Sequence, residues 1–216
     1  MMRRLAGPFI LLAAAAALAA PRAESQSQAS ARGPAQATAV FAGGCFWGIE
    51  GVFRHMKGVT SATSGYAGGS VASPTYEQVG TGATGHAESV RVTYDPTRVS
   101  YEQLLEVFFT VAHDPTQLNR QGPDHGTQYR SIVFYSDTVQ RREVKAFVAE
   151  LTNKKRFAKP IVTEIVPLTA FYPAEEYHQN YMARNPTALY IVYHDAPKVA
   201  NLQRQFPALY TERVVE

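Results

Sequence analysis

The alternation of strand-like and helix-like segments along the chain is the feature that most constrains its fold. Alternating or β-rich runs predict strands at residues 38–42, 59–66, 87–94, 129–135 and 161–166. Helical spacing or a capping pair predicts helices that begin just after Cys45, at Ser100, at Asp137 and at Ala174, the last running to Arg184. Because these elements interleave within the length of one domain, we expect an α/β (α+β) fold, a two-layer sandwich with a mixed β-sheet.

Two connections in this pattern, residues 66–88 and 113–129, are longer than most loops. Long ordered loops carry binding and catalytic residues more often than short ones do. We therefore expect these two loops to contribute to a functional site. The part of the chain beyond residue 184 is expected to be short and irregular.

The N-terminal residues have the composition of an export signal rather than of a folded element. Two arginines precede an apolar run that ends in the small side chains typical of a cleavage site. The run is shorter than the ~20 residues that a membrane span needs, so stable membrane insertion is not expected. We predict a signal peptide at 1–19, a flexible leader at 20–37 and a folded domain at 38–216, exported to the periplasm or secreted.

Charge gives little reason to expect an anionic partner. The formal net charge is +3, and removal of residues 1–19 would take away two arginines and no acidic residue. The remaining chain is nearly neutral, so nucleic acid is not an expected partner.

The chain contains a single cysteine, Cys45. This count excludes a disulfide framework, a CxxC redox pair and a cysteine-rich zinc site within the chain, and the scattered histidines give no reason to expect a metal. Cys45 follows two glycines at the predicted start of a helix, where unpaired N–H groups and the helix dipole favour the thiolate. The residues alone leave open that Cys45 is instead buried and inert.

Three side chains could complete a site around a reactive Cys45. Phe46 and Trp47 follow it directly; they are either ordinary core residues or a surface that receives a small apolar group such as a methyl. Glu88 opens the strand after the first long loop. It is either a surface residue or, if the loop encloses it, a carboxyl whose pKa burial raises so that it donates a proton near neutral pH.

The long loops contain three further polar candidates. Asp124 lies in the second loop, where an aspartate commonly caps a turn. Tyr76 and Tyr129 flank the loops, and each could donate a hydrogen bond to a polar oxygen. With twelve tyrosines in the chain, either one is a weak indication by itself.

Cys45 and its surroundings are compatible with two kinds of function. Cys45 and a histidine brought close by the fold could form a cysteine-dependent hydrolase or acyl transferase, although no spacing selects one histidine. The chain could also be a non-catalytic secreted module that binds methionine-rich partners or dimerises through Cys45.

Five segments, taken in order, resemble the A-type peptide methionine sulfoxide reductases. The segments are Gly44-Cys45-Phe46-Trp47-Gly48, Gly65-Tyr66-Ala67-Gly68-Gly69, Gly85-His86-Ala87-Glu88, the run from Gln121 to Ser131, and Ala174-Glu175-Glu176-Tyr177-His178-Gln179. The resemblance extends from about Val40 to Asn185 and so covers nearly the whole predicted domain. Each motif is modest by itself, but five in the same order are highly specific.

The resemblance implies a two-layer α/β fold and reduction of the S epimer of methionine sulfoxide, free or in proteins, without a metal or organic cofactor. It implies that Cys45 is the nucleophile and passes through a sulfenic acid. The roles it implies for the other residues are polar contacts to the sulfoxide oxygen from Glu88, Tyr76 and Tyr129, a methyl-binding surface of Phe46 and Trp47, and support from Asp124.

The chain departs from the resemblance in one respect. Many members carry further cysteines near the C-terminus that resolve the sulfenic acid as a disulfide, whereas this sequence has none. An external thiol, thioredoxin-like or small, is therefore expected to reduce Cys45 directly. The expected partners are oxidised proteins, free methionine sulfoxide and this thiol, and we expect a monomer.

Overall fold

The computed structural model describes residues 36–214. The predicted signal peptide at 1–19 lies outside the described residues, as does all but the end of the predicted leader at 20–37. Within the described range, no helix combines the length and the apolar character needed to cross a membrane.

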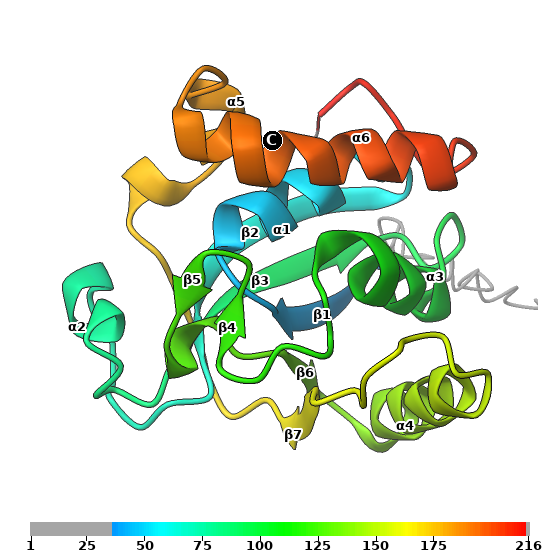
Figure 1. Ribbon diagram of the computed structural model, residues 1–216, viewed down its shortest axis with the longest axis horizontal. Coiled ribbons are helices and arrows are strands. Elements are labelled where there is room, and N and C mark those ends of the chain that lie inside the picture. The colour runs from blue at the N-terminus through cyan, green and yellow to red at the C-terminus, as the bar shows by residue number, and fades with distance from the viewer. Residues whose placement is uncertain (1–35, 215–216) are drawn as a thin grey trace, which may run out of the picture. The chain divides into compact units, whose positions relative to one another are not determined.

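Six strands form one mixed sheet in the order β7-β6-β1-β3-β2-β8 (Figure 1). Their bounds are Ala37–Ala42 for β1, Val59–Ala67 for β2, Ala87–Tyr94 for β3, Ile132–Tyr135 for β6, Glu164–Pro167 for β7 and Phe171–Pro173 for β8. Neighbouring strands are antiparallel except for β6 and β7, which are parallel. A separate two-residue hairpin pairs β4 (Arg120–Gln121) with β5 (Asp124–His125).

Helices and single helical turns connect and cover these strands. The α-helices are Phe46–Arg54 (α1), Tyr76–Gly80 (α2), Tyr101–Val107 (α3), Thr138–Asn153 (α4), Tyr181–Arg184 (α5) and Ala196–Gln205 (α6). Short 3₁₀ turns span Thr127–Tyr129 (η2) and Glu176–His178 (η3), and π-helical turns span Phe108–Ala112 (η1) and Ile191–Asp195 (η4). In Figure 1, α6 runs beside α1 on the same side of the sheet, and the two helices are in contact.

The two faces of the sheet carry very different amounts of apolar surface. Along β1, Ala39 and Phe41 belong to the large core that packs against the helices. Val40 and Ala42 point to the opposite face and belong to a much smaller cluster. This two-residue alternation places nearly all of the core between the sheet and one helical layer. The expected α/β sandwich with a mixed sheet is confirmed.

The predicted helix starts at Ser100 and Asp137 are also confirmed. The Ser100 hydroxyl accepts the backbone N–H of Gln103, and the Gln103 side chain accepts the N–H of Ser100. The Asp137 carboxylate accepts the N–H groups of Val139 and Gln140. Caps of this kind stabilise a helix by about 1 kcal/mol because they satisfy N–H groups that have no partner within the helix.

Two expectations for the C-terminal part are wrong. The helix predicted over 174–184 is interrupted, because Asn180 adopts a left-handed backbone with φ 53° between η3 and α5. The region beyond residue 184 is largely helical rather than irregular, since it forms η4 and the ten-residue helix α6. A proline in the first turn of α6 is a common start signal that marks this helix.

Strand and loop boundaries also differ from expectation in the two long connections. The first connection contains the helix α2, which begins at the capping box of Thr75 and Gln78. In the second connection, Tyr129 lies in the turn η2, and the strand that was expected to start there begins at Ile132. The strand expected from residue 161 begins at Glu164.

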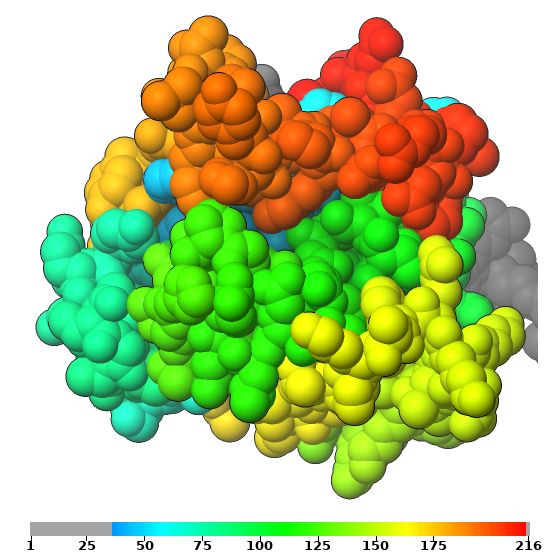
Figure 2. All heavy atoms as spheres, viewed as in Figure 1, coloured from blue at the N-terminus to red at the C-terminus, as the bar shows by residue number. Residues whose placement is uncertain are grey.

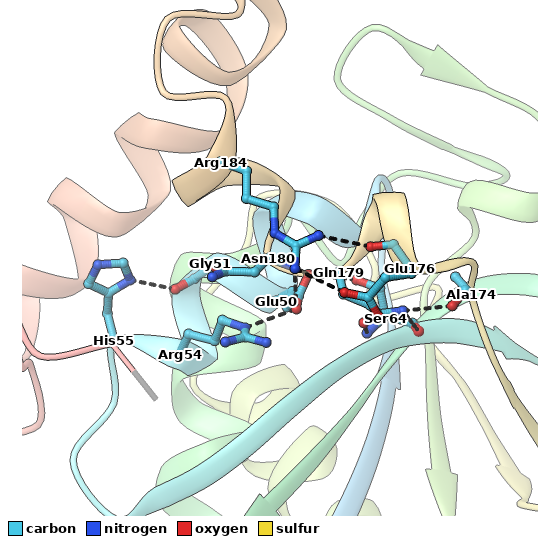
Figure 3. A network of polar contacts seen from close by, with 10 residues as sticks. All are labelled: Glu50, Gly51, Arg54, His55, Ser64, Ala174, Glu176, Gln179, Asn180 and Arg184. Carbon is cyan, nitrogen blue, oxygen red and sulfur yellow. Dashed lines mark hydrogen bonds and ion pairs between the residues drawn. The ribbon is translucent and has the colours of Figure 1, made fainter. Parts of the chain in front are cut away.

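A buried carboxylate explains the break at Asn180 (Figure 3). The Glu50 carboxylate on α1 accepts the backbone N–H of Asn180 at 3.0 Å, the Ser64 hydroxyl at 2.9 Å and the Arg54 Nε–H at 2.9 Å. The Gln179 side chain pairs with the backbone N–H and carbonyl of Ser64, both at 3.0 Å. These contacts tie α1, β2 and the segment after β8 together, so the segment follows the network rather than its own helical spacing.

We expect Glu50→Ala to lower the free energy of unfolding by about 3 kcal/mol or more, because the substitution removes the acceptor of three hydrogen bonds in the interior. Urea denaturation measures this value. Glu150→Ala is the matched control, since Glu150 pairs with Lys154 on the exposed face of α4 and such pairs contribute less than about 1 kcal/mol. Equal losses for the two variants would contradict the importance of the network.

Candidate active site

Cys45 lies at the turn between β1 and α1. It is the residue that precedes the first helical residue, Phe46, and its exposed fraction is 8%. Gly44 has φ +100°, and a Cβ there would lie 2.5 Å from the Gln121 side chain of the second long connection. A glycine is required at this position for its backbone angle and for the close approach of that loop. The thiol therefore sits at the helix N-terminus and is almost completely buried.

Glu88 lies next to the same helical turn. It is near the start of β3, its exposed fraction is 3%, and its Oε2 accepts the backbone N–H of Phe46 at 3.1 Å. In the register of the sheet, Tyr66 of β2 is directly opposite Glu88. The fold thus brings Glu88 to the residue that follows Cys45, although 42 residues separate the donor and acceptor in the sequence.

Burial decides the protonation state of Glu88. Removal from water raises the pKa of this carboxyl to about 8, and the charges of Asp124 and Asp195 act in the same direction. The Phe46 N–H lowers the pKa but does not outweigh burial. Glu88 is therefore predominantly a neutral acid at pH 7 and can donate a proton there.

The expectation that the helix N-terminus makes Cys45 a thiolate is wrong for the free protein. Burial raises the pKa of the Cys45 thiol well above its usual value, and the carboxylate charges of Glu88 and Asp195 raise it further. The Trp47 backbone N–H and the Lys198 ammonium lower the pKa, but their effects are smaller. Desolvation therefore exceeds the helix-terminus effect, and both Cys45 and Glu88 hold their protons.

Phe46 and Trp47 differ in their exposure to solvent. Phe46 is completely buried. The centroid of its ring lies 5.9 Å from that of Tyr66 and 5.0 Å from that of His178. Trp47 is half-buried, and its indole stacks on Tyr181 at a centroid distance of 3.8 Å. The Trp47 Nε1–H donates to His178 Nδ1 at 3.1 Å, which fixes the orientation of the indole. Trp47 is thus the more accessible part of this aromatic surface.

Tyr76 and Tyr129 approach the site from the two long connections. Burial raises the pKa of Tyr76 to about 12 and raises that of Tyr129, and the charge of Glu88 is the next cause for both. Both phenols therefore keep their protons and can donate hydrogen bonds. The Tyr76 backbone N–H donates to Glu175 at 2.9 Å, and Glu175 also accepts the Tyr66 hydroxyl at 2.8 Å, so the C-terminal segment positions this part of the site.

Asp124, in the hairpin strand β5, accepts a hydrogen bond from the Tyr190 hydroxyl. Tyr190 was not identified from the sequence, because the region beyond residue 184 was expected to be irregular. Its ring meets the Trp47 indole edge-on at a centroid distance of 5.9 Å. The hairpin and the C-terminal segment therefore meet beside Trp47.

Other residues around the site were also missed. His178 and Tyr181 hold the Trp47 indole, and Asp195 and Lys198 influence Cys45. His178 lies within a motif noted in the sequence, but nothing in its spacing connects it with Trp47. The sequence offers only one indication of the Asp195–Lys198 pair, namely that three positions separate the two residues. This separation is common on helical surfaces and does not indicate a site.

Two buried histidines that could have served a metal site or a catalytic pair make structural contacts instead. His113 donates to the Phe108 carbonyl and accepts from Ser131, and burial lowers its pKa to about 4. His86 accepts the Gly69 N–H and donates to the Val71 carbonyl. Among residues 36–214, no group of three or more metal-ligating side chains is present. These contacts do not favour a cysteine–histidine hydrolase.

Comparison with known proteins gives a consistent result. Residues 37–209 match the family described as peptide methionine sulfoxide reductase. A relative from Mesorhizobium japonicum, named peptide methionine sulfoxide reductase MsrA 2, is 57% identical over 84% of this chain and 93% of its own length. A relative from Natronomonas pharaonis, peptide methionine sulfoxide reductase MsrA, is 54% identical over 79% of this chain and 95% of its own length.

Two solved structures resemble the fold. Methionine sulfoxide reductase A of Corynebacterium diphtheriae superimposes with a TM-score of 0.67 and 39% identity, over 73% of this chain and 78% of that one. Mxr1 from Saccharomyces cerevisiae in reduced form gives a TM-score of 0.65 and 36% identity, over 71% of this chain and 87% of that one. The likeness therefore covers both the sequence and the arrangement of the sheet and helices.

The raised pKa of Glu88 predicts that the free energy of unfolding depends on pH. Because the folded pKa of about 8 exceeds the usual value of 4.5, the folded state binds one more proton than the unfolded state between these values. The stabilisation from this proton is present at low pH and is lost as pH rises toward 8, by up to about 1.4 kcal/mol per pH unit. We expect Glu88→Gln to lack this slope.

Urea unfolding at several values between pH 5 and pH 8 tests this linkage. The informative quantity is the difference between the wild type and Glu88→Gln, since groups that do not couple with Glu88 titrate identically in both proteins. Parallel stability curves for the two proteins would show that Glu88 is already ionised in the folded state.

Proposed function

This chain belongs to the peptide methionine sulfoxide reductase family, and we propose that it reduces the S epimer of methionine sulfoxide through a sulfenic acid on Cys45. The proposed substrates are free methionine sulfoxide and oxidised methionine in proteins. The observation that carries the proposal is the hydrogen bond from the Phe46 N–H to the Glu88 carboxyl, which places a buried acid beside the turn of the single cysteine. Oxidative damage repair is the corresponding role.

Glu88 supplies the proton that the reaction requires. A sulfoxide oxygen leaves sulfur only when it is protonated, and Glu88 is a neutral acid near pH 7. As Glu88 gives its proton to this oxygen, the carboxylate that forms can accept the proton of the Cys45 thiol. The Cys45 sulfur bonds to the oxygen as the sulfur–oxygen bond of the substrate breaks. Sulfoxide and thiol thus become sulfide and sulfenic acid, with all atoms and electrons accounted for.

Tyr76 and Tyr129 stabilise the oxygen during this transfer. Both are protonated, both are half-buried, and both lie close enough to Glu88 and Cys45 for these charges to affect their pKa values. Fixed phenol donors aimed at a developing charge in a site with little water lower the barrier without reorganisation. Asp124 supports the same wall, because it binds Tyr190 beside Trp47.

The arrangement of apolar and polar walls supports selection of one epimer. A methyl group on the sulfoxide sulfur fits against the half-buried Trp47, which the completely buried Phe46 ring supports from the core, while the oxygen faces Glu88 and the two phenols. Exchange of the methyl and the oxygen would place the oxygen against aromatic carbon and leave buried polar groups without partners. Such mismatches cost about 1–3 kcal/mol for each unsatisfied group.

Regeneration of Cys45 requires an external reductant in this proposal. The sequence offers no second cysteine that could form an internal disulfide. One thiol of a thioredoxin-like protein or a small molecule displaces water from the sulfenic acid and forms a mixed disulfide with Cys45. A second thiol then releases Cys45 and leaves the reductant oxidised.

Export of the chain and its location in the periplasm or outside the cell are also proposals. They rest on the composition of residues 1–19, which lie outside the described residues. Comparison of the molecular mass before and after secretion would test the cleavage. An unprocessed chain retained in the cytoplasm would contradict it.

The activity is tested by incubating the protein with the separate S and R epimers of methionine sulfoxide and a dithiol. We expect methionine from the S epimer only, and no product from Cys45→Ser. Dimedone should label Cys45 after exposure to the S epimer when no reductant is present. Turnover of both epimers, or activity without Cys45, would contradict the proposal.

Glu88→Gln should lower the rate of the reductive step by about 100- to 10,000-fold, because it removes the acid that protonates the oxygen. In the wild type, the rate should fall as pH rises through about 8, where Glu88 loses its proton. Single-turnover assays across pH measure both effects. Glu102→Gln, an exposed position on α3, is the control. A Glu88→Gln rate within a few-fold of the wild type would mean that the proton has another source.

A further inference from the structure

A buried ion pair at the start of α6 carries out no step of the chemistry described above. Asp195 is the last residue of η4, and its Oδ1 accepts a hydrogen bond from Lys198 Nζ at 3.1 Å. The Asp195 side chain is completely buried, and the Lys198 side chain is 19% exposed. The other oxygen of Asp195, Oδ2, is buried and has no hydrogen-bond partner among the described residues. A charge held in this way costs stability, which makes the pair a candidate for a functional role.

The pair packs directly against the helix that carries the nucleophile. A Cβ at Gly48 would lie 2.1 Å from Asp195 Oδ1 and 2.6 Å from Lys198 Nζ. Gly48 lies in the first turn of α1, three residues after Cys45. Only glycine leaves room for the pair, and this accounts for a residue that weakens a helix by about 1 kcal/mol relative to alanine. Figure 1 shows α6 beside α1, as this packing requires.

We propose that the Asp195–Lys198 ion pair is a positioning element for the reaction, which packs on the first turn of α1 and sets the reactivity of Cys45 by its charges. The inference rests on the proposed role of Cys45 as the nucleophile. Asp195 and Lys198 do not touch the reacting atoms in this account and act through Cys45 and Glu88. They are therefore positioning residues rather than catalytic residues.

The charges of Asp195 and Lys198 shift the pKa of the nucleophile, and the charge of Asp195 also shifts the pKa of the acid. Asp195 raises the pKa of Cys45 and that of Glu88, whereas Lys198 lowers the pKa of Cys45. Asp195 thus helps to keep both protons in the site, and one of them is the proton that the sulfoxide oxygen takes. Lys198 limits this effect, so that the thiol can still be deprotonated when substrate is bound.

The neighbouring groups do not replace the pair. The other titratable groups that couple with Cys45 are Glu88 on β3 and three phenols, Tyr76, Tyr129 and Tyr190, which stay protonated and therefore carry no charge. Asp195 itself is influenced by Lys198, by Asp124 on β5 and by His194 on η4. Among these groups, Lys198 is the cation that lowers the pKa of Cys45.

The pH dependence of Cys45 alkylation by iodoacetamide tests this inference. The full chain is suitable because Cys45 is its single thiol, and the assay does not depend on sulfoxide reduction. Asp195→Asn keeps the shape of the side chain and removes its negative charge. We expect the midpoint of alkylation to fall by about one pH unit in this variant, since a nearby charge shifts a pKa by that order.

The double variant Asp195→Asn with Lys198→Met removes both charges. We expect the alkylation midpoint of the double variant to lie closer to that of the wild type than the midpoint of Asp195→Asn does. Its shift should be at most about half of the shift seen for Asp195→Asn, because the net charge beside Cys45 is again zero. Lys154→Met is the control, since Lys154, the residue that follows α4, forms an exposed ion pair of similar spacing with Glu150. Its midpoint should equal that of the wild type.

The result distinguishes this inference from the proposed function and from a purely structural role. An unchanged midpoint in Asp195→Asn, or an equal shift in the single and double variants, would overturn the inference even if sulfoxide reduction is intact. Loss of sulfoxide reduction in the wild type would overturn the proposed function and leave the alkylation result unaffected. Urea unfolding of each variant confirms that the measured midpoint belongs to the folded protein.

Discussion

The hydrogen bond between the Phe46 N–H and the Glu88 carboxyl is the contact on which the site depends. It joins the helix N-terminus that carries Cys45 to a strand from a distant part of the sequence. A helix N-terminus ordinarily favours an ionised carboxylate and a thiolate. Here burial is the stronger effect for both groups, so the free protein holds a thiol and a neutral acid side by side. The protonated acid is the form that an oxygen-transfer reaction can use.

The rest of the structure keeps this contact enclosed and oriented. Glu50 fixes the chain after β8 (Figure 3). His178 and Tyr181 from this part of the chain hold the Trp47 indole. Segments far apart in the sequence cover the site from outside, and the space-filling view in Figure 2 shows the second long connection lying directly against the C-terminal helices. A buried carboxyl with a raised pKa requires this coverage, because water would restore its usual pKa.

Local sequence patterns were sufficient to predict much of the fold. The capping residues at Ser100 and Asp137 located two helices, and the alternation in residues 87–94 located β3, because these signals act within a few residues. The segment after β8 was predicted incorrectly, since a distant carboxylate, Glu50, determines its path. In the site, motif order predicted Cys45, Glu88 and their aromatic neighbours, which the structure brings together, whereas Tyr190, Asp195 and Lys198 could be found only in three dimensions. The thiolate prediction failed because a sequence shows a helix N-terminus but not the burial that opposes it.

The central claim is that Glu88 is a neutral acid beside a protonated Cys45 in the folded protein. Infrared difference spectroscopy tests it most directly, because the carbonyl stretch of a protonated carboxyl is separate from that of a carboxylate. A pH titration of the wild type minus Glu88→Gln should show a protonated-carboxyl band at pH 7 that disappears with a midpoint of about 8. A midpoint near the usual value of 4.5, or no such band at pH 7, would contradict the account.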